Sequence, residues 1–233
     1  MAKKALVTGG TKGIGYSTTL KLKELGYDVT VIGRDFSNFN IEGVKTIKYD
    51  LSDVDNLSTI VDEVGDIDVL VNNAAVGNKK RFDNYPEEAI ERIVNVNIKA
   101  PVSLITLFAP SLKKNKGRVV NVASQAAEIG HKDVWYGITK AGLVNATKSF
   151  SAILGPEGVQ INAVAPGPVE TTMIQTSDPV FAERYEKLRN RTILGRIAKP
   201  EEIADAIVWL ATEAPEYING ETIDLNNGAQ RIK

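Results

Sequence analysis

The chain has 233 residues, a length that suits one large domain and allows a sizeable buried core. It carries 28 basic and 29 acidic residues, so no overall charge would steer it to nucleic acid or to an anionic membrane. Cysteine is absent, which excludes disulfides and thiol chemistry, and His131 is the only histidine, which argues against a zinc site. The expected partners are therefore small molecules or further copies of the chain, with no metal.

The N-terminal residues Met1-Ala2-Lys3-Lys4 run directly into a predicted strand. They contain no apolar signal segment and no cleavage pattern. No uncharged run approaches the length that a bilayer requires. We therefore expect a soluble, cytoplasmic protein.

Short apolar runs rich in β-branched residues alternate along the chain with longer helical patterns. The expected strands are 5–8, 29–32, 46–49, 69–72, 118–122, 160–164 and 222–225. This alternation is typical of a parallel sheet with crossover helices, and apolar central runs indicate strands covered on both faces. The sequence predicts one α/β domain over residues 1–233, a Rossmann-like, doubly wound parallel sheet of about seven strands in a three-layer α/β/α arrangement.

A glycine-rich turn, Thr8-Gly9-Gly10-Thr11-Lys12-Gly13-Ile14-Gly15, follows the first strand and precedes an amphipathic run over 16–25. Such a turn lets the backbone approach a pyrophosphate, while the first N–H groups of the helix point at the anion. The turn could instead serve only to pack a helix on the sheet. The residues expected to contact a dinucleotide here are Gly9, Thr11, Lys12, Gly13, Ile14 and Gly15.

A tyrosine and a lysine, Tyr136 and Lys140, lie four residues apart in a helical pattern and should project from one face of the helix. A nearby ammonium favours the phenolate, so Lys140 is expected to lower the pKa of Tyr136 toward the working range. Ser124 follows the strand 118–122, where its hydroxyl could hold a substrate oxygen beside Tyr136. The pair alone could arise by chance, and the glycine turn upstream favours a functional interpretation.

These motifs, in this order, resemble the short-chain dehydrogenase/reductase family from Lys4 to Gly228. The motifs are the glycine turn, Asp50, Asn72-Asn73-Ala74-Ala75, Asn97, Ser124, Tyr136, Lys140 and Pro166-Gly167. The resemblance implies that Tyr136 exchanges a proton with the substrate oxygen, that Lys140 also binds the nicotinamide ribose, and that Asn97 organises the lysine and a water for proton relay. The spacing from Ser124 to Tyr136 is one residue shorter than in many members. This difference affects the expected shape of the loop between them and leaves the four site residues unchanged.

The resemblance also implies which residues meet the cofactor. Beyond the glycine turn and the tyrosine–lysine pair, they are Arg34, Asp50, Leu51, Asn73, Ala74, Pro166, Gly167, Val169 and Thr171. Asp50 could instead cap the following helix. Gly33 stands where NAD-specific relatives carry an acid, and Arg34 and Lys12 could pair with a 2′-phosphate, so NADP(H) is predicted. Asp35 opposes this assignment.

An excursion over about 168–198 leaves the sheet at a strand's carboxyl end, and we expect it to form a substrate lid. Arg184, Lys187, Arg189, Arg191 and Arg196 make it basic, although interleaved acids favour a solvated helix face. The leading substrate is a 3-oxoacyl thioester, since the chain resembles the 3-oxoacyl-carrier-protein reductases. Residues 172–175 offer no arginine to a carrier, and Lys113, Lys114 and Lys116 could substitute.

Other functions stay open. A sugar, a steroid or a small ketone could be the substrate, and a protein of another class, a regulatory NADP(H)-binding protein without turnover, would keep the same fold. His131 is expected at the surface and Trp135 in packing or the pocket wall. The resemblance implies a homotetramer or a homodimer, formed through helices at about 101–114 and 136–154.

Overall fold

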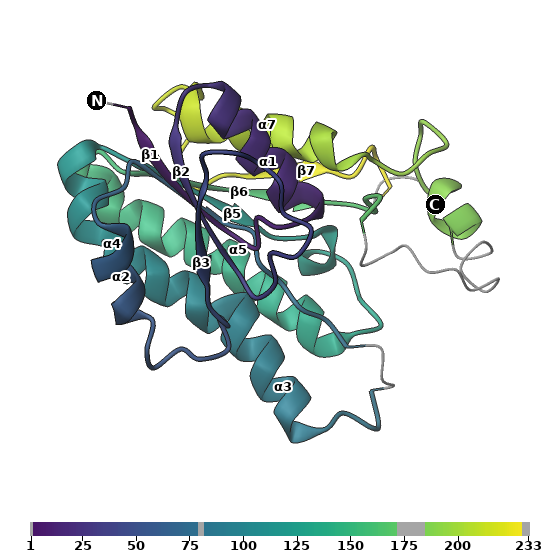
Figure 1. The fold of residues 1–233 in the computed structure, drawn as a ribbon. Coiled ribbons are helices and arrows are strands. Elements are labelled where there is room, and N and C mark those ends of the chain that lie inside the picture. Colours follow the sequence, from purple (N-terminus) through teal and green to yellow (C-terminus); the bar gives the residue numbers. More distant parts are fainter. Residues whose placement is uncertain (1, 79–81, 172–184, 230–233) are drawn as a thin grey trace.

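A computed structural model describes residues 2–78, 82–171 and 185–229 (Figure 1). Its centre is a parallel seven-stranded sheet with the order β3-β2-β1-β4-β5-β6-β7. The strands are β1 (Lys4–Thr8), β2 (Asp28–Gly33), β3 (Lys45–Lys48), β4 (Val69–Asn72), β5 (Arg118–Val122), β6 (Gln160–Pro166) and β7 (Thr222–Leu225). All the predicted strands are present, with ends that differ by no more than two residues.

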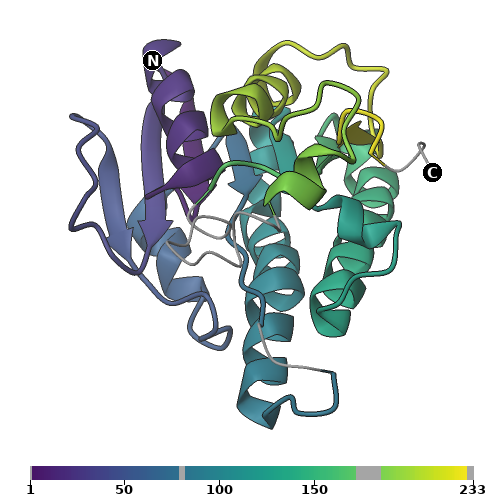
Figure 2. The ribbon, with the colours of Figure 1, turned by 90° about the vertical axis from the view of Figure 1, so that its right-hand side faces the viewer.

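Helices cover both faces of this sheet (Figures 1 and 2). They are α1 (Gly13–Glu24), α2 (Ser58–Val64), α3 (Glu87–Val94), α4 (Ala100–Asn115), α5 (Val134–Leu154) and α7 (Pro200–Thr212). The α1 and α7 helices pack together on one face, whereas α2, α4 and α5 contribute to the core on the other. The predicted doubly wound, three-layer α/β/α fold is confirmed.

Side chains of each central strand divide between these two cores. On β1, Leu6 belongs to the cluster that contains Phe108 of α4, whereas Val7 belongs to the cluster that contains Leu22 of α1. Because successive strand residues point to opposite faces, a strand buried on both sides must be apolar throughout. Burial of each such side chain contributes about 1.5–3 kcal/mol to stability. This packing holds the strands in place, and with them the polar residues at the strand ends.

The α3 and α4 helices form one continuous helix through a π-helical turn at Asn95–Lys99. The span Glu87–Asn115 is long and apolar enough to cross a membrane by length and composition, but half of its apolar window is buried inside the fold. Such burial is ordinary for the core helix of a globular domain. The π-turn matters more, because such turns concentrate at functional positions and this one contains Asn97.

The strand order reverses direction at β1, which pairs with β2 on one side and with β4 on the other. This switch point opens a crevice at the carboxyl ends of the strands, where ligands bind in open α/β sheets. The excursion that begins after β6 also starts there. A parallel bridge between Val169 and Ala198 holds its two ends together, with Glu170 N donating to Ala198 O at 2.8 Å. The central part of the predicted lid, 172–184, lies outside the described residues.

Candidate active site

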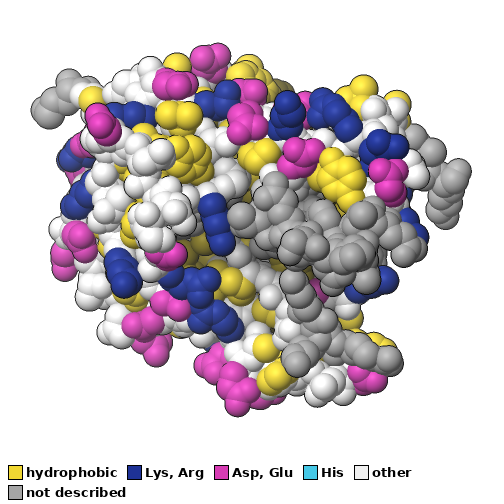
Figure 3. Space-filling model, turned by 45° about the vertical axis from the view of Figure 1, so that its right-hand side comes forward, with side chains coloured by type: hydrophobic (Ala, Val, Ile, Leu, Met, Phe, Trp, Pro, Cys, Tyr) yellow, Lys and Arg dark blue, Asp and Glu magenta, His cyan; other side chains and the backbone are white. Residues whose placement is uncertain are grey.

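A cavity of about 700 Å³ opens at this edge of the sheet. Its walls come from the residues that follow β1, β2, β4, β5 and β6 and from the start of α5. Figure 3 shows basic and acidic side chains interspersed on the face drawn, in keeping with the balanced overall charge. Most of the predicted site residues line the cavity: Gly9, Thr11, Lys12, Gly13, Ile14, Arg34, Asp50, Leu51, Asn73, Ala74, Ser124, Tyr136, Lys140, Pro166, Gly167, Val169 and Thr171.

The glycine turn requires residues without side chains at three positions. Gly9 and Gly13 have φ angles of 65° and 54°, in the left-handed region that other residues rarely adopt. A Cβ at Gly15 would lie 2.3 Å from the carbonyl oxygen of Gly9 and 2.4 Å from Nδ2 of Asn73. The turn therefore depends on glycine for its shape as well as for close ligand approach.

The first turn of α1 lacks a side-chain cap. Its N-cap residue, Lys12, is extended and makes no capping hydrogen bond. The free N–H groups at the start of a helix attract an anion. The start of α1 therefore lacks a side-chain cap, as the predicted phosphate cradle requires.

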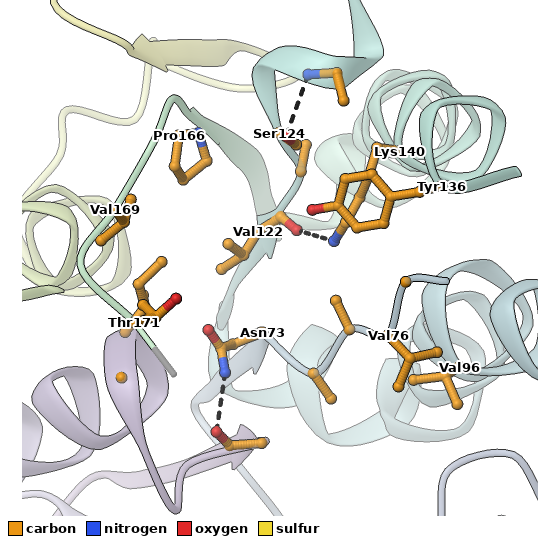
Figure 4. Close-up of a pocket in the computed structure, with 18 of the residues that line it drawn as sticks. Asn73, Val76, Val96, Val122, Ser124, Tyr136, Lys140, Pro166, Val169 and Thr171 are labelled. Atoms are coloured by element: carbon orange, nitrogen blue, oxygen red, sulfur yellow. Dashed lines mark hydrogen bonds between the residues drawn. The ribbon is translucent and has the colours of Figure 1, made fainter. Parts of the chain in front are cut away.

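Asn73 ties the glycine turn to the strand ends. Its Nδ2 donates to Thr8 O at 2.9 Å and to Gly9 O at 3.1 Å, while the Thr8 hydroxyl accepts from Asn73 N and Ala74 N (Figure 4). These bonds join the carboxyl ends of β1 and β4. The Asn73-Ala74 segment thereby supports the cofactor wall that the sequence predicts.

At the end of β2, Arg34 and Lys12 line the cavity, and both are exposed. Neither side chain has a hydrogen-bond or ion-pair partner among the described residues. Asp35 accepts a hydrogen bond from Ser37 N at 2.9 Å, and bonds from the Ser37 backbone and hydroxyl hold the pKa of Asp35 below its usual range. A Cβ at Gly33 would meet Cγ2 of Thr11 at 2.7 Å, so this position accommodates an acidic side chain poorly.

Asp50 has a partner that the sequence did not suggest. Its carboxylate accepts two bonds from one guanidinium nitrogen of Arg92, at 2.9 and 3.1 Å, and also accepts from Ser52 N. Burial opposes the charge of Asp50, but the bonds from Ser52 and Arg92 prevail and lower its pKa. Asp50 lines the cavity, as the cofactor prediction requires. The alternative role as a helix cap is wrong, because α2 begins at Ser58 with Leu57 as its N-cap, and the Asp50 carboxylate instead stabilises the turn after β3.

Three polar residues meet at the opposite end of the cavity. Tyr136 and Lys140 approach β5 side by side from α5, and Ser124 lies just beyond β5 (Figure 4). Lys140 is only 1% exposed, and its Nζ donates to Val122 O at 2.6 Å and lies 5.8 Å from the Tyr136 ring centroid. The Ser124 hydroxyl accepts from Ala126 N, and it acts on the Tyr136 hydroxyl by lowering its pKa.

The electrostatics of this group differ from the expectation that Lys140 lowers the pKa of Tyr136. Burial raises the pKa of Tyr136, the bond with Ser124 lowers it, and the charge of Asp133 raises it, with a net upward direction. Burial also lowers the pKa of Lys140 to about 7. The lysine is thus partly neutral at neutral pH, which weakens the field that the sequence argument assumed.

Asn97 lies in the π-turn and is fully buried. Its Oδ1 accepts from Val76 N and its Nδ2 donates to Val76 O, both at 2.8 Å, and Nδ2 also donates to the Thr139 hydroxyl at 3.2 Å. The side chain therefore joins the loop after β4 to α5. Val76 and Thr139 occupy both amide hydrogens of Asn97, and its expected role of organising Lys140 and a relay water stays a prediction.

The loop after β6 forms the wall opposite Tyr136. Pro166, Val169 and Thr171 are seen on that wall in Figure 4. The Thr171 methyl carbon lies 3.1 Å from the position that a Cβ on Gly13 would take. The loop therefore packs against the glycine turn, as the predicted cofactor contacts require.

Sequence reasoning missed Asp133, Tyr85 and Arg92. Asp133 is the N-cap of α5, and an Asp directly before an amphipathic run is a helix-start signal that could have identified it. His131 is exposed, as predicted, but it also lines the cavity, and its ring centroid lies 5.3 Å from that of Tyr136. Trp135 is half-buried and does not line the cavity.

The structure changes one prediction about charged residues and agrees with another. Lys113 and Lys114 pair with Glu157 and Asp66, at the end of α4 that leads into the amino end of β5. The cavity opens at the carboxyl ends, so these lysines cannot serve a carrier at its mouth. In the excursion, Arg189 pairs with Glu186 and Arg196 with Glu202, as expected of a solvated face, while Arg184 lies outside the described residues.

The fold and the cavity define a dinucleotide-binding α/β protein. A family model described as enoyl-(acyl carrier protein) reductase matches residues 9–230. The 3-oxoacyl-[acyl-carrier-protein] reductase of Thermotoga maritima is 32% identical, over 97% of each chain. L-xylulose reductase of Mesocricetus auratus is 34% identical, over 97% of this chain and 96% of that one. A short chain dehydrogenase family protein from Francisella tularensis superimposes with a TM-score of 0.87 at 27% identity, over all of both chains.

The chain belongs to the short-chain dehydrogenase/reductase family. It is accordingly an oxidoreductase of carbonyl and alcohol groups that works with a nicotinamide cofactor.

Proposed function

We propose that the protein is an NADP(H)-dependent reductase of a carbonyl substrate, with Tyr136 as the proton donor. The observation that carries this proposal is the meeting of Ser124, Tyr136 and Lys140 at one end of a cavity whose other end is the glycine turn. A regulatory protein that only binds the cofactor could use buried Lys140 for the ribose, but it would have no need for a half-buried tyrosine beside Ser124 at the same end of the cavity. Burying such groups costs free energy unless they serve a function.

The cavity fits a nicotinamide dinucleotide. The uncapped start of α1 and the left-handed glycines would receive the pyrophosphate, and Asp50 and Leu51 would border the adenine. Lys140 would bind the nicotinamide ribose, and the wall of Pro166, Gly167, Val169 and Thr171 would hold the nicotinamide end. When bound, the reduced nicotinamide supplies a hydride to the carbonyl carbon of the substrate.

The residues of this chain would manage the proton and the oxygen. The Ser124 hydroxyl orients the substrate oxygen beside Tyr136, whose raised pKa keeps its proton available at neutral pH. The Tyr136 hydroxyl gives its proton to the oxygen as the C–O bond order falls. Lys140, with a pKa of about 7, is suited to return a proton to the tyrosine. Asn97 holds the wall and α5 together, and its part in a relay remains a prediction.

Preference for NADP(H) follows from the end of β2. Arg34 and Lys12 are exposed, unpaired among the described residues and on the cavity wall, so both are free to meet a 2′-phosphate. The acid that could oppose them, Asp35, is turned to Ser37. Gly33 leaves no carboxylate at the strand end to bind a 2′-hydroxyl.

A 3-oxoacyl thioester is the proposed substrate, supported by the reductase from Thermotoga maritima among the relatives. A sugar-like ketone is the second candidate. It is favoured by the likeness to L-xylulose reductase and by polar side chains at the reaction end, where Gln125 and His131 line the cavity. Because Lys113 and Lys114 cannot serve a carrier at the cavity mouth, the thioester is less strongly favoured over the sugar-like ketone.

We also propose that the protein is cytoplasmic and forms a homotetramer or homodimer through α4 and α5. The exposed Ile138 and Ile153 on α5, 53% and 64% accessible, support a partner on that face. Sedimentation velocity of the purified protein measures the assembly directly.

The test is consumption of NADPH and, in parallel, of NADH with an acetoacetyl thioester, a ketopentose and a panel of unrelated ketones. We expect turnover with NADPH and preference for the thioester. Tyr136→Phe should lower kcat by about 10²–10⁴-fold and leave NADPH binding intact. NADPH binding without turnover of any carbonyl would instead favour a regulatory protein.

A further inference from the structure

Asp133 is a buried carboxylate beside the proposed proton donor, and the mechanism above does not use it. Its side chain belongs to a residue that is 7% exposed, at the N-cap position of α5, three residues before Tyr136. A buried charge is costly unless several donors satisfy it. The hydrogen bonds that satisfy the Asp133 carboxylate therefore indicate its role.

Three donors from three segments converge on this carboxylate. Oδ1 accepts from Tyr136 N at 3.1 Å and from the Tyr85 hydroxyl at 2.6 Å, and Oδ2 accepts from Asn78 N at 2.6 Å. Gly77 packs directly against it, since a Cβ there would lie 3.1 Å from Oδ2. One carboxylate thus joins the loop after β4, the segment before α3 and the first turn of α5.

These bonds fix the reaction end of the cavity from two sides. The bond to Tyr136 N is the cap of α5, and it sets where the first turn of the helix places the Tyr136 ring. The bond to Asn78 N holds the facing wall. Asn97 holds the same wall two residues earlier, through its two hydrogen bonds to Val76. A shift of about 1 Å at a reacting group can cost about 10²-fold in rate.

We propose that Asp133 is a positioning residue for Tyr136, which fixes the ring and the facing wall of the cavity and adds a negative charge to the surroundings of the ring. This inference rests on the proposed role of Tyr136 as proton donor. Asp133 acts through Tyr136 and through the wall, and it does not itself touch the reacting atoms.

The charges around Tyr136 agree with this role. Burial raises the pKa of Tyr136, and the charge of Asp133 raises it further, against the lowering bond from Ser124. Within the described ranges, the other titratable groups that face the ring are Lys140 from α5 and His131 from the preceding loop. Burial and the bond to Asp133 raise the pKa of Tyr85 to about 12, so Tyr85 keeps donating over the working pH range.

The test is the pH dependence of kcat/KM for NADPH-dependent carbonyl reduction by D133N. The amide keeps an oxygen for Tyr136 N and removes the charge. Reduction needs protonated Tyr136, so activity falls as pH rises through its pKa. Removing a negative charge lowers that pKa, and the alkaline limb should move to lower pH by about half a unit to one unit. The matched control is E128Q, the same charge change at an exposed carboxylate outside the cavity, which should leave the limb in place.

D133A separates positioning from folding. We expect kcat to fall by about 10²-fold while the dissociation constant of NADPH changes by less than about threefold. Superimposable pH profiles for wild type and D133N would overturn the proposal. So would a D133A variant in which NADPH affinity falls as far as kcat, because that outcome describes a general structural role.

A second readout does not need turnover. The tyrosinate absorbance titration of each protein, minus that of its Y136F counterpart, isolates the titration of Tyr136, and D133N should move it to lower pH by the same amount. If the wild type reduces no carbonyl, the proposed function fails, while this titration still decides whether Asp133 controls Tyr136. An unmoved titration would remove the electrostatic part of the inference.

Discussion

The two ends of the cavity hold positive charge in opposite ways. At the end formed by the glycine turn and β2, Arg34 and Lys12 are exposed and have no partners among the described residues. At the reaction end, Lys140 is 1% exposed, and its Nζ is bound to a backbone carbonyl. Exposed cations stay free to meet an anion, whereas a buried cation is fixed in place and loses part of its charge. One end is suited to recognition and the other to proton transfer.

The recognition end should fail most severely when its backbone shape is changed. Gly15→Ala would place a Cβ within 2.3 Å of Gly9 O, so the turn must shift. We expect a loss of about 3 kcal/mol in the free energy of unfolding and a rise of about 10²-fold in the dissociation constant of NADPH. Gly130→Ala is the control, because nothing lies within 4 Å of its added Cβ, and it should change stability by less than about 0.5 kcal/mol. Normal NADPH binding by Gly15→Ala would contradict the cradle.

At the reaction end, the buried Lys140 should make the free energy of unfolding depend on pH. The pKa of Lys140 is about 7 in the folded protein against 10.5 for an ordinary lysine. Between these values the unfolded chain binds more protons, so this lysine makes stability rise with pH, and its penalty is fully present below pH 7. Relative to Lys140→Met, the wild type should gain about 2 kcal/mol between pH 7 and pH 9. Urea denaturation of both proteins at the two pH values measures this, and a pH-independent difference would refute it.

Substitution of an exposed cation should have the smallest effect of the three changes, and this effect should be selective for NADPH over NADH. Arg34→Asp should raise the dissociation constant of NADPH by about tenfold and that of NADH by much less, because only NADPH carries the 2′-phosphate. Fluorescence titration with both cofactors measures the two constants. Lys48→Asp is a matched control, since Lys48 is exposed and does not line the cavity. Equal losses for both cofactors would remove Arg34 from phosphate recognition.

The same contrast explains what could be predicted from the sequence. The glycine turn is a local requirement, so its residues can be identified from a strand, a run of glycines and a helix. The spacing of Tyr136 and Lys140 is also local. Asp133 and Arg92 could not be assigned their partners, because Asn78 lies 55 residues from Asp133 and Asp50 lies 42 residues from Arg92. Spacing along a helix predicts that two side chains are neighbours and leaves the polarity of their surroundings undetermined.

That limit accounts for the revised view of the tyrosine–lysine pair. The sequence places Lys140 beside Tyr136, and the structure agrees, but the depth of burial decides the direction of both pKa shifts. Burial is a property of the assembled sheet and of Val122 on β5, not of the helix that carries the pair. The charge that acts on Tyr136 comes instead from the cap of its own helix, Asp133.

The backbone bridge between Val169 and Ala198 has a consequence for how such a protein can change over generations. Because the stretch between them starts and ends at paired positions on one rigid frame, its length and composition can vary without moving a strand. The bridge makes this stretch an exchangeable module, so a new substrate preference could be acquired by replacing it while the proton-transfer group and the cofactor cradle are inherited unchanged.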